Sequence, residues 1–192
     1  CRLPGDAPAS VRLHLNAANS RSPTVGGERI GAGGSFRNGL FDGDILTAEY
    51  GQTEGLYDAF IAYQMPFLHP RLTLDVRGEV NEADVVDPAL LALDIRSESQ
   101  AGEVGLGYKL VQRPILPRED GKGFHSARTV SVGARVSHKE SQTFLLGMPF
   151  SFSPGSIDGK AEITATRLTV DWVERAETSV SAASLIVSHG LD

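Results

Sequence analysis

Apolar and polar residues alternate with a period of two along most of this chain. Every second residue from Leu72 to Val80 is apolar or glycine, and three of the four residues between them are charged. Successive side chains of a strand point to opposite faces, so this pattern predicts a strand with one apolar and one charged face. The same pattern recurs along the chain. It predicts nine strands, at about 10–21, 28–40, 44–54, 57–67, 71–84, 97–112, 127–140, 160–175 and 179–190.

The alternation divides the candidate functional residues into two sets. The charged set is Arg12, Asp75, Arg77, Glu79, Lys109, Arg135, Lys139, Arg167 and Asp171. The apolar set is Leu72, Leu74, Val76, Val130, Val132, Leu168, Val170 and Trp172. In a soluble β-sandwich the apolar set packs inward, whereas in an outer-membrane β-barrel it faces lipid and the charged set lines the lumen. Alternation alone does not separate these two arrangements.

Strand length and loop length favour the barrel. A strand needs about 9–11 residues to cross a membrane, and most of the predicted strands have that many. Long connections at 81–96 and 141–159 fall at one end of the strands, and short turns fall at the other, as in bacterial outer-membrane barrels. The segment 114–126 breaks this rule, because it is long but falls on the short-turn side. Asp87-Pro88 predicts one helical turn within 89–95.

Composition excludes several classes of protein. The 192 residues carry a net charge of −6 without a basic block, which argues against a nucleic-acid-binding surface. No stretch approaches the roughly 20 apolar residues of a membrane-spanning helix. Glycine is abundant, at 21 residues, whereas an average chain of this length has about 13. Cys1 in place of Met predicts a cut or processed chain; a lipoprotein begins with Cys too.

Signatures of catalysis and metal binding are absent from the sequence. The five histidines are scattered without metal-ligand spacing, and a single cysteine excludes a cysteine-based metal site. Gly33–Arg37 lacks the last glycine of a nucleophile elbow, and Gly105-Leu106-Gly107 lacks the third glycine of a dinucleotide site. We therefore expect no enzyme activity, no catalytic residue, no metal and no cofactor.

Several segments resemble one family, the outer-membrane transporters of two-partner secretion (TpsB), also called haemolysin secretion and activation proteins. Asn16–Thr24 resembles the family's first barrel hairpin, and Phe36–Asp44 resembles its first inner turn. Gly51–Leu56, followed by Tyr63–Pro66, resembles the next hairpin. The most specific segment is ESQTFLLGMPFSFSPG, starting at Glu140 and followed by Asp158-Gly159, Arg167-Leu168 and Asp171-Trp172. Together these segments cover nearly the whole chain in the family's order.

The resemblance implies an all-β fold, an antiparallel transmembrane β-barrel in the bacterial outer membrane. Residues 1–9 would be a linker from periplasmic POTRA domains, and residues 10–192 would be the first half of a sixteen-stranded barrel. The family's transporters pass an unfolded partner exoprotein of the haemolysin or adhesin type to the cell surface. The implied partners are this exoprotein and outer-membrane lipid, with a monomeric barrel and no nucleic acid.

Three other functions are compatible with the alternation. The barrel could be a general porin or an outer-membrane insertase relative, which a neighbouring gene for a large secreted protein would argue against. It could be a barrel lipase, for which no suitably spaced Ser and His pair is present. Or the sheet could belong to a soluble all-β binding module, which recovery in the soluble fraction would support.

Overall fold

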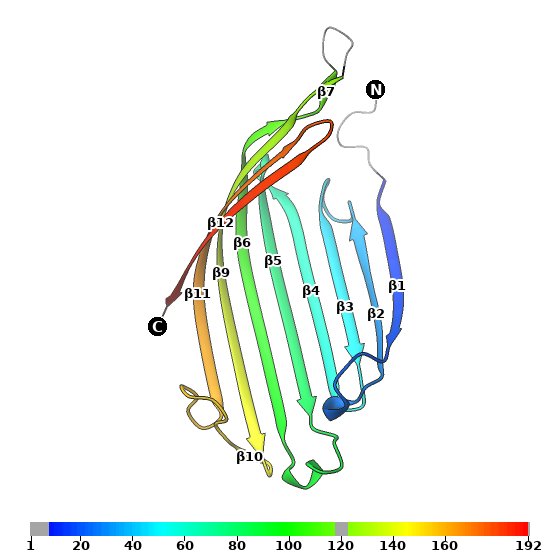
Figure 1. The fold of residues 1–192 in the computed structure, drawn as a ribbon, viewed down its shortest axis with the longest axis vertical. Helices are drawn as coiled ribbons and strands as arrows, with labels where there is room; N and C mark the ends of the chain where they lie inside the picture. The colour runs from blue at the N-terminus through cyan, green and yellow to red at the C-terminus, as the bar shows by residue number, and fades with distance from the viewer. Residues whose placement is uncertain (1–7, 118–122, 192) are drawn as a thin grey trace.

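The chain folds into one long, twisted antiparallel sheet (Figure 1). The computed structural model describes residues 8–117 and 123–191. Every predicted strand is present, and each pairs with its neighbours in chain order. The nine long strands are β1 (Ser10–Ala18), β2 (Arg29–Arg37), β3 (Ile45–Gln52), β4 (Leu56–Phe67), β5 (His69–Asp84), β6 (Arg96–Arg113), β9 (Ala127–Leu145), β11 (Lys160–Arg175) and β12 (Val180–Leu191).

The largest error in the predicted boundaries concerns β9. This strand continues five residues past the predicted end at 140, and β10 (Met148–Pro149) folds back on it. The turn between them uses Leu146 and Gly147, both with positive φ, as in the type I′ turns of two-residue hairpins. At the other end of the sheet, β1 stops at Ala18, three residues earlier than predicted, before the short 3₁₀ helix η1 (Pro23–Val25).

Most connections follow the predicted division into short turns and long loops, although the short β3–β4 turn (53–55) lies at the end with the long loops. The loops after β5 and β9 lie at the bottom of Figure 1, and the turns before β5 and β12 lie at the top. The loop after β5 holds the predicted helical turn as the 3₁₀ helix η2 (Leu91–Leu93). The exceptional segment 114–126 extends the β6–β9 hairpin, since β7 (Leu116–Pro117) pairs with β8 (Phe124–His125). Most of the predicted linker, residues 1–7, lies outside the described residues.

The apolar side chains of this sheet are more exposed than many of its charged ones. Among the described residues no hydrophobic side chain is buried, and Val104 and Leu168 are 52% and 59% exposed. The side chains of Asp75 and Glu103 on the opposite face are only 17% and 18% exposed. A water-soluble sandwich has the reverse distribution. Among the described residues, no helix is long and apolar enough to span a membrane.

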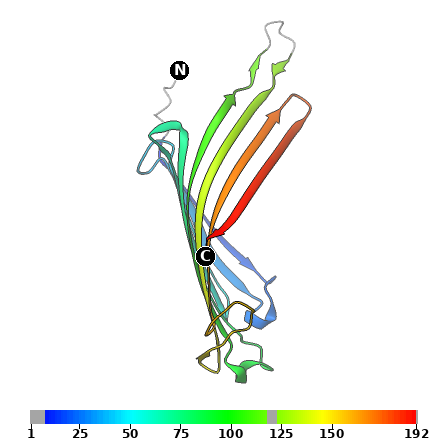
Figure 2. The ribbon, with the colours of Figure 1, turned by 90° about the vertical axis from the view of Figure 1, so that its left-hand side faces the viewer.

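The band of apolar residues crosses the strands obliquely. On the loop side the band is bordered by Glu82 on β5 and Glu162 on β11. Followed through the strand pairing, Glu162 reaches Val80 on β5, so this border moves two residues over three strand-to-strand steps. The strands are therefore tilted from the normal to the band. Strands of β-barrels are typically tilted by about 35–45°. Figure 2 shows the accompanying bend of the sheet.

Candidate functional site

The strand register places the two predicted sets on opposite faces of the sheet. In one row of paired residues, Asp75 lies next to Gly105, then Arg135 and Arg167. The adjacent row is apolar. All nine residues of the charged set share the first face, here called the charged face, and all eight of the apolar set share the other, the apolar face. That the charged face lines a lumen and the apolar face meets lipid stays a prediction.

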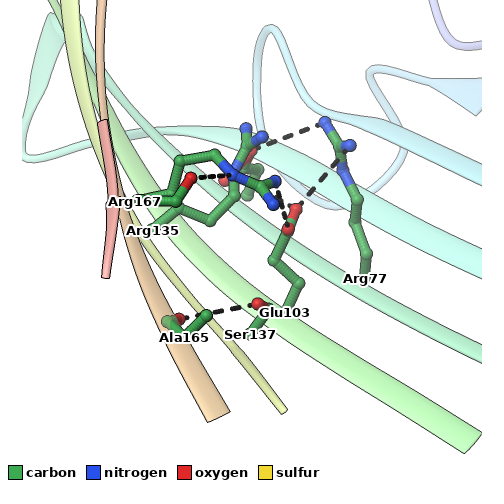
Figure 3. Close-up of polar contacts among 8 residues, drawn as sticks. Arg77, Glu103, Arg135, Ser137, Ala165 and Arg167 are labelled. Carbon is green, nitrogen blue, oxygen red and sulfur yellow. Dashed lines mark hydrogen bonds and ion pairs between the residues drawn. The ribbon is translucent and has the colours of Figure 1, made fainter. Parts of the chain in front are cut away.

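An ion-pair network occupies the middle of the charged face. Arg135 on β9 donates to Asp75 on β5 at 2.7 Å and pairs through Nε with Glu103 on β6 at 3.2 Å. Arg77 lies 3.6 Å from Asp75 and 3.7 Å from Glu103, and Arg167 on β11 reaches Glu103 at 3.9 Å. Figure 3 shows the three guanidinium groups turned toward the Glu103 carboxylate. The network joins four strands and has a net charge of +1.

Gly105 makes this network possible. It lies between Asp75 and Arg135 in the register, and a Cβ on Gly105 would collide with the Asp75 carboxylate and crowd the Arg135 Nε at 3.1 Å. Because Gly105 has no side chain, Asp75 and Arg135 can meet across β6, which would otherwise separate them. Glycine weakens a strand, and here that cost is offset by a cross-strand contact.

A second ion pair also crosses a glycine, near the edge of the sheet that β1 forms. Arg29 on β2 extends over Gly51 of β3 to Asp58 on β4, where its Nε donates at 3.1 Å and its Nη2 forms an ion pair. Arg29 donates to Asn16 at 3.3 Å, and Arg21 lies 3.7 Å from Asp58. Sequence analysis missed Arg29 and Asp58. Their positions at the ends of alternating strands were a usable signal, but their pairing depends on the register.

The other members of the charged set are more isolated. Asp171 accepts a hydrogen bond from Ser184 at 2.7 Å. Within residues 8–117 and 123–191, no ion pair involves the remaining four, which are Arg12, Glu79, Lys109 and Lys139. The described part of the chain also contains no group of three or more His, Cys, Asp or Glu side chains that could hold a metal ion. The network therefore unites four predicted residues with Glu103, which was not among the predicted set.

Charged residues border the apolar band at both ends of the strands. The loop-side rim consists of two ion-paired clusters: Arg96 with Glu82 and Glu98, and Lys160 with Glu140 and Glu162. The turn-side rim has Arg128, whose Nη2 pairs with Glu174 at 2.9 Å. Twelve residues separate the rims along β9 and along β11. At about 3.3 Å per residue and the tilt of about 35° that is typical of barrel strands, the rims lie about 32 Å apart along the band normal. The hydrocarbon core of a typical bilayer is about 30 Å thick.

The turn between β2 and β3 is organised around a buried carboxylate. Asp44 is 2% exposed and accepts hydrogen bonds at 2.8–3.0 Å from the amides of Gly39, Leu40 and Phe41 and from the Tyr63 hydroxyl. Burial alone would raise the pKa of Asp44, but these four donors favour the ionised form and lower it to about 2. The carboxylate thus fixes this turn against β4.

Comparison with known proteins bears on the fold. No family model and no curated protein sequence matches the chain. CdiB from Escherichia coli is similar in structure over 97% of this chain, with a TM-score of 0.72 and 13% sequence identity. The chain has the fold of the CdiB β-barrel. CdiB from Acinetobacter baumannii is similar over 95% of the chain, with a TM-score of 0.62 and 18% identity.

The similarity confirms the predicted fold class, but it covers only part of each CdiB chain. The chain spans 32% of the length of each CdiB chain, so it corresponds to part of a barrel. The resemblance noted in the sequence is confirmed as far as the fold. That the chain is the first half of a sixteen-stranded barrel stays a prediction.

Proposed function

We propose that this chain is part of the wall of a β-barrel in the bacterial outer membrane. The exposed apolar band supports this, because its charged rims lie about as far apart as the two surfaces of a bilayer core. The oblique course of the band supports it too, since strands of outer-membrane barrels are tilted. The longer loops would face the cell exterior and the shorter turns the periplasm.

The complete barrel would secrete an unfolded partner exoprotein in two-partner secretion. The observation that carries this proposal is the network around Glu103, set on the charged face of a sheet with the fold of CdiB. Transport is proposed for the whole protein, of which this chain is a part.

The charged face suits the passage of an unfolded polypeptide. Such a chain needs a hydrated path without large apolar surfaces to which it would adhere. Side chains of both signs, held in place by one another, keep the path hydrated and bind no single sequence tightly. Arg77 and Arg135 would set the local potential, and the protein would transport its partner without catalysing a reaction.

A secretion assay tests the proposal. The gene for the full-length protein is deleted, and the exoprotein encoded beside it is quantified in the culture medium and in the periplasm. We expect the exoprotein to disappear from the medium and to return when the wild-type gene is supplied. Unchanged secretion in the deletion strain would refute the transport function. Recovery of the full-length protein in the soluble fraction would refute the membrane barrel itself.

A further inference from the structure

The apolar face is hollowed near its loop-side rim, where two glycines lie side by side. Gly78 on β5 pairs with Gly102 on β6, between Ile61 on β4 and His138 on β9. A Cβ on Gly102 would meet no atom within 4 Å, and one on Gly78 would meet only Ile61, at 3.5 Å. The glycines are part of the lining of a cavity of about 500 Å³ that opens on this face, here called the glycine cavity.

The lining of the glycine cavity is apolar on one side and polar on the other. Ile61 and Val80 form part of its apolar side, and Gln100, His138 and Glu140 form its polar side. Gln100 donates to Glu140 at 3.3 Å, and Lys160 of the loop-side rim lies 3.0 Å from the same carboxylate. An amide, an imidazole and a carboxylate together offer donors and acceptors for the hydroxyl groups of a sugar.

We propose that the glycine cavity binds lipopolysaccharide, the glycolipid of the outer leaflet, in an inference that rests on the proposed membrane barrel. The cavity continues the apolar band and ends at the rim that carries the long loops, so it lies at the depth where acyl chains join head groups. An acyl chain would lie against Ile61 and Val80 over the bare glycine backbone. The hydroxyl groups of the sugar would contact Gln100 and His138.

The test compares two glycines of one strand. Gly102→Leu fills the cavity, whereas Gly107→Leu is the matched control, because Gly107 is equally open but lies on the charged face. Full-length wild-type protein and both variants are purified in mild detergent and incubated with lipopolysaccharide or with phosphatidylethanolamine. Native mass spectrometry measures the bound lipid. Heat-modifiable migration on gels verifies that each variant is a folded barrel, and Gly78→Leu provides a second way to fill the cavity.

We expect the wild type and Gly107→Leu to bind lipopolysaccharide alike and in preference to phosphatidylethanolamine. Lost contact with two methylenes lowers binding about tenfold, so Gly102→Leu and Gly78→Leu should bind about ten times more weakly. Equal binding by wild type and both cavity variants would overturn the inference, as would equal binding of the two lipids. A membrane barrel that binds no lipopolysaccharide refutes this inference alone, whereas a soluble protein refutes the proposed function with it.

Discussion

A charge placed at the centre of the apolar band should destabilise the barrel folded in a membrane. Leu168 on β11 lies six residues from Glu162 in one rim and six from Glu174 in the other, and it is 59% exposed. It is thus midway between the rims. Arginine at the lipid-facing midplane of a β-barrel costs about 2–4 kcal/mol. Leu168→Arg should therefore lower the equilibrium constant for folding by about 30- to 900-fold.

The adjacent residue supplies the control. Thr169 is paired with Gly133 on the charged face, so Thr169→Arg adds the same side chain to the hydrated side. Full-length variants are unfolded in urea and refolded into phosphatidylcholine vesicles, and the folded fraction is followed by heat-modifiable migration. We expect Thr169→Arg to change the free energy of folding by less than about 1 kcal/mol. Equal destabilisation by both substitutions would show that the assignment of the two faces is wrong.

Three further predictions address the charged face and the β2–β3 turn. Gly105→Ala should disrupt the Asp75–Arg135 pair, so the barrel should unfold at lower urea concentration than one carrying Gly107→Ala, whose Cβ meets no neighbour. Glu103→Gln leaves three arginines with only Asp75, and reversal potentials in planar bilayers should shift toward anion selectivity, whereas Glu98→Gln on the rim should leave them unchanged. Asp44 has a pKa of about 2, below the unfolded value of about 3.9, so its stabilising effect is present above pH 4 and lost as pH falls toward 2. Asp44→Asn should therefore lower the urea midpoint at pH 7, with a difference from wild type that shrinks between pH 4 and 2; a pH-independent difference would contradict this account.

The sequence was sufficient to predict the strands, because a sheet with one apolar face imposes its period on the residues themselves. The same logic explains the error in β9. Beyond Val136 the apolar face continues with His138 and Glu140, so the alternation fades although β9 still pairs with β6 and β11. Backbone pairing extends past the apolar band, and the amino-acid pattern does not report it.

The candidate site was only partly predictable for a different reason. Charged residues could be assigned to a face strand by strand, but their contacts depend on the register between strands. Arg135 meets Asp75 across sixty positions of sequence, through the gap at Gly105. Arg29 likewise meets Asp58 across Gly51. The sequence places glycines at these positions, but it does not show which side chains cross them, so the networks were not foreseen.

The exposed apolar face has a consequence for how such a sheet comes to exist in the cell. A soluble domain is already stable in water, because its apolar side chains pack against one another. Here Val104 and Leu168 gain little from folding until lipid covers them. Folding and membrane insertion should therefore be a single event. Before insertion the unfolded chain must be kept from aggregating. The time for which it survives unfolded in the periplasm, more than the stability of the inserted barrel, should therefore limit the amount of protein that reaches the membrane.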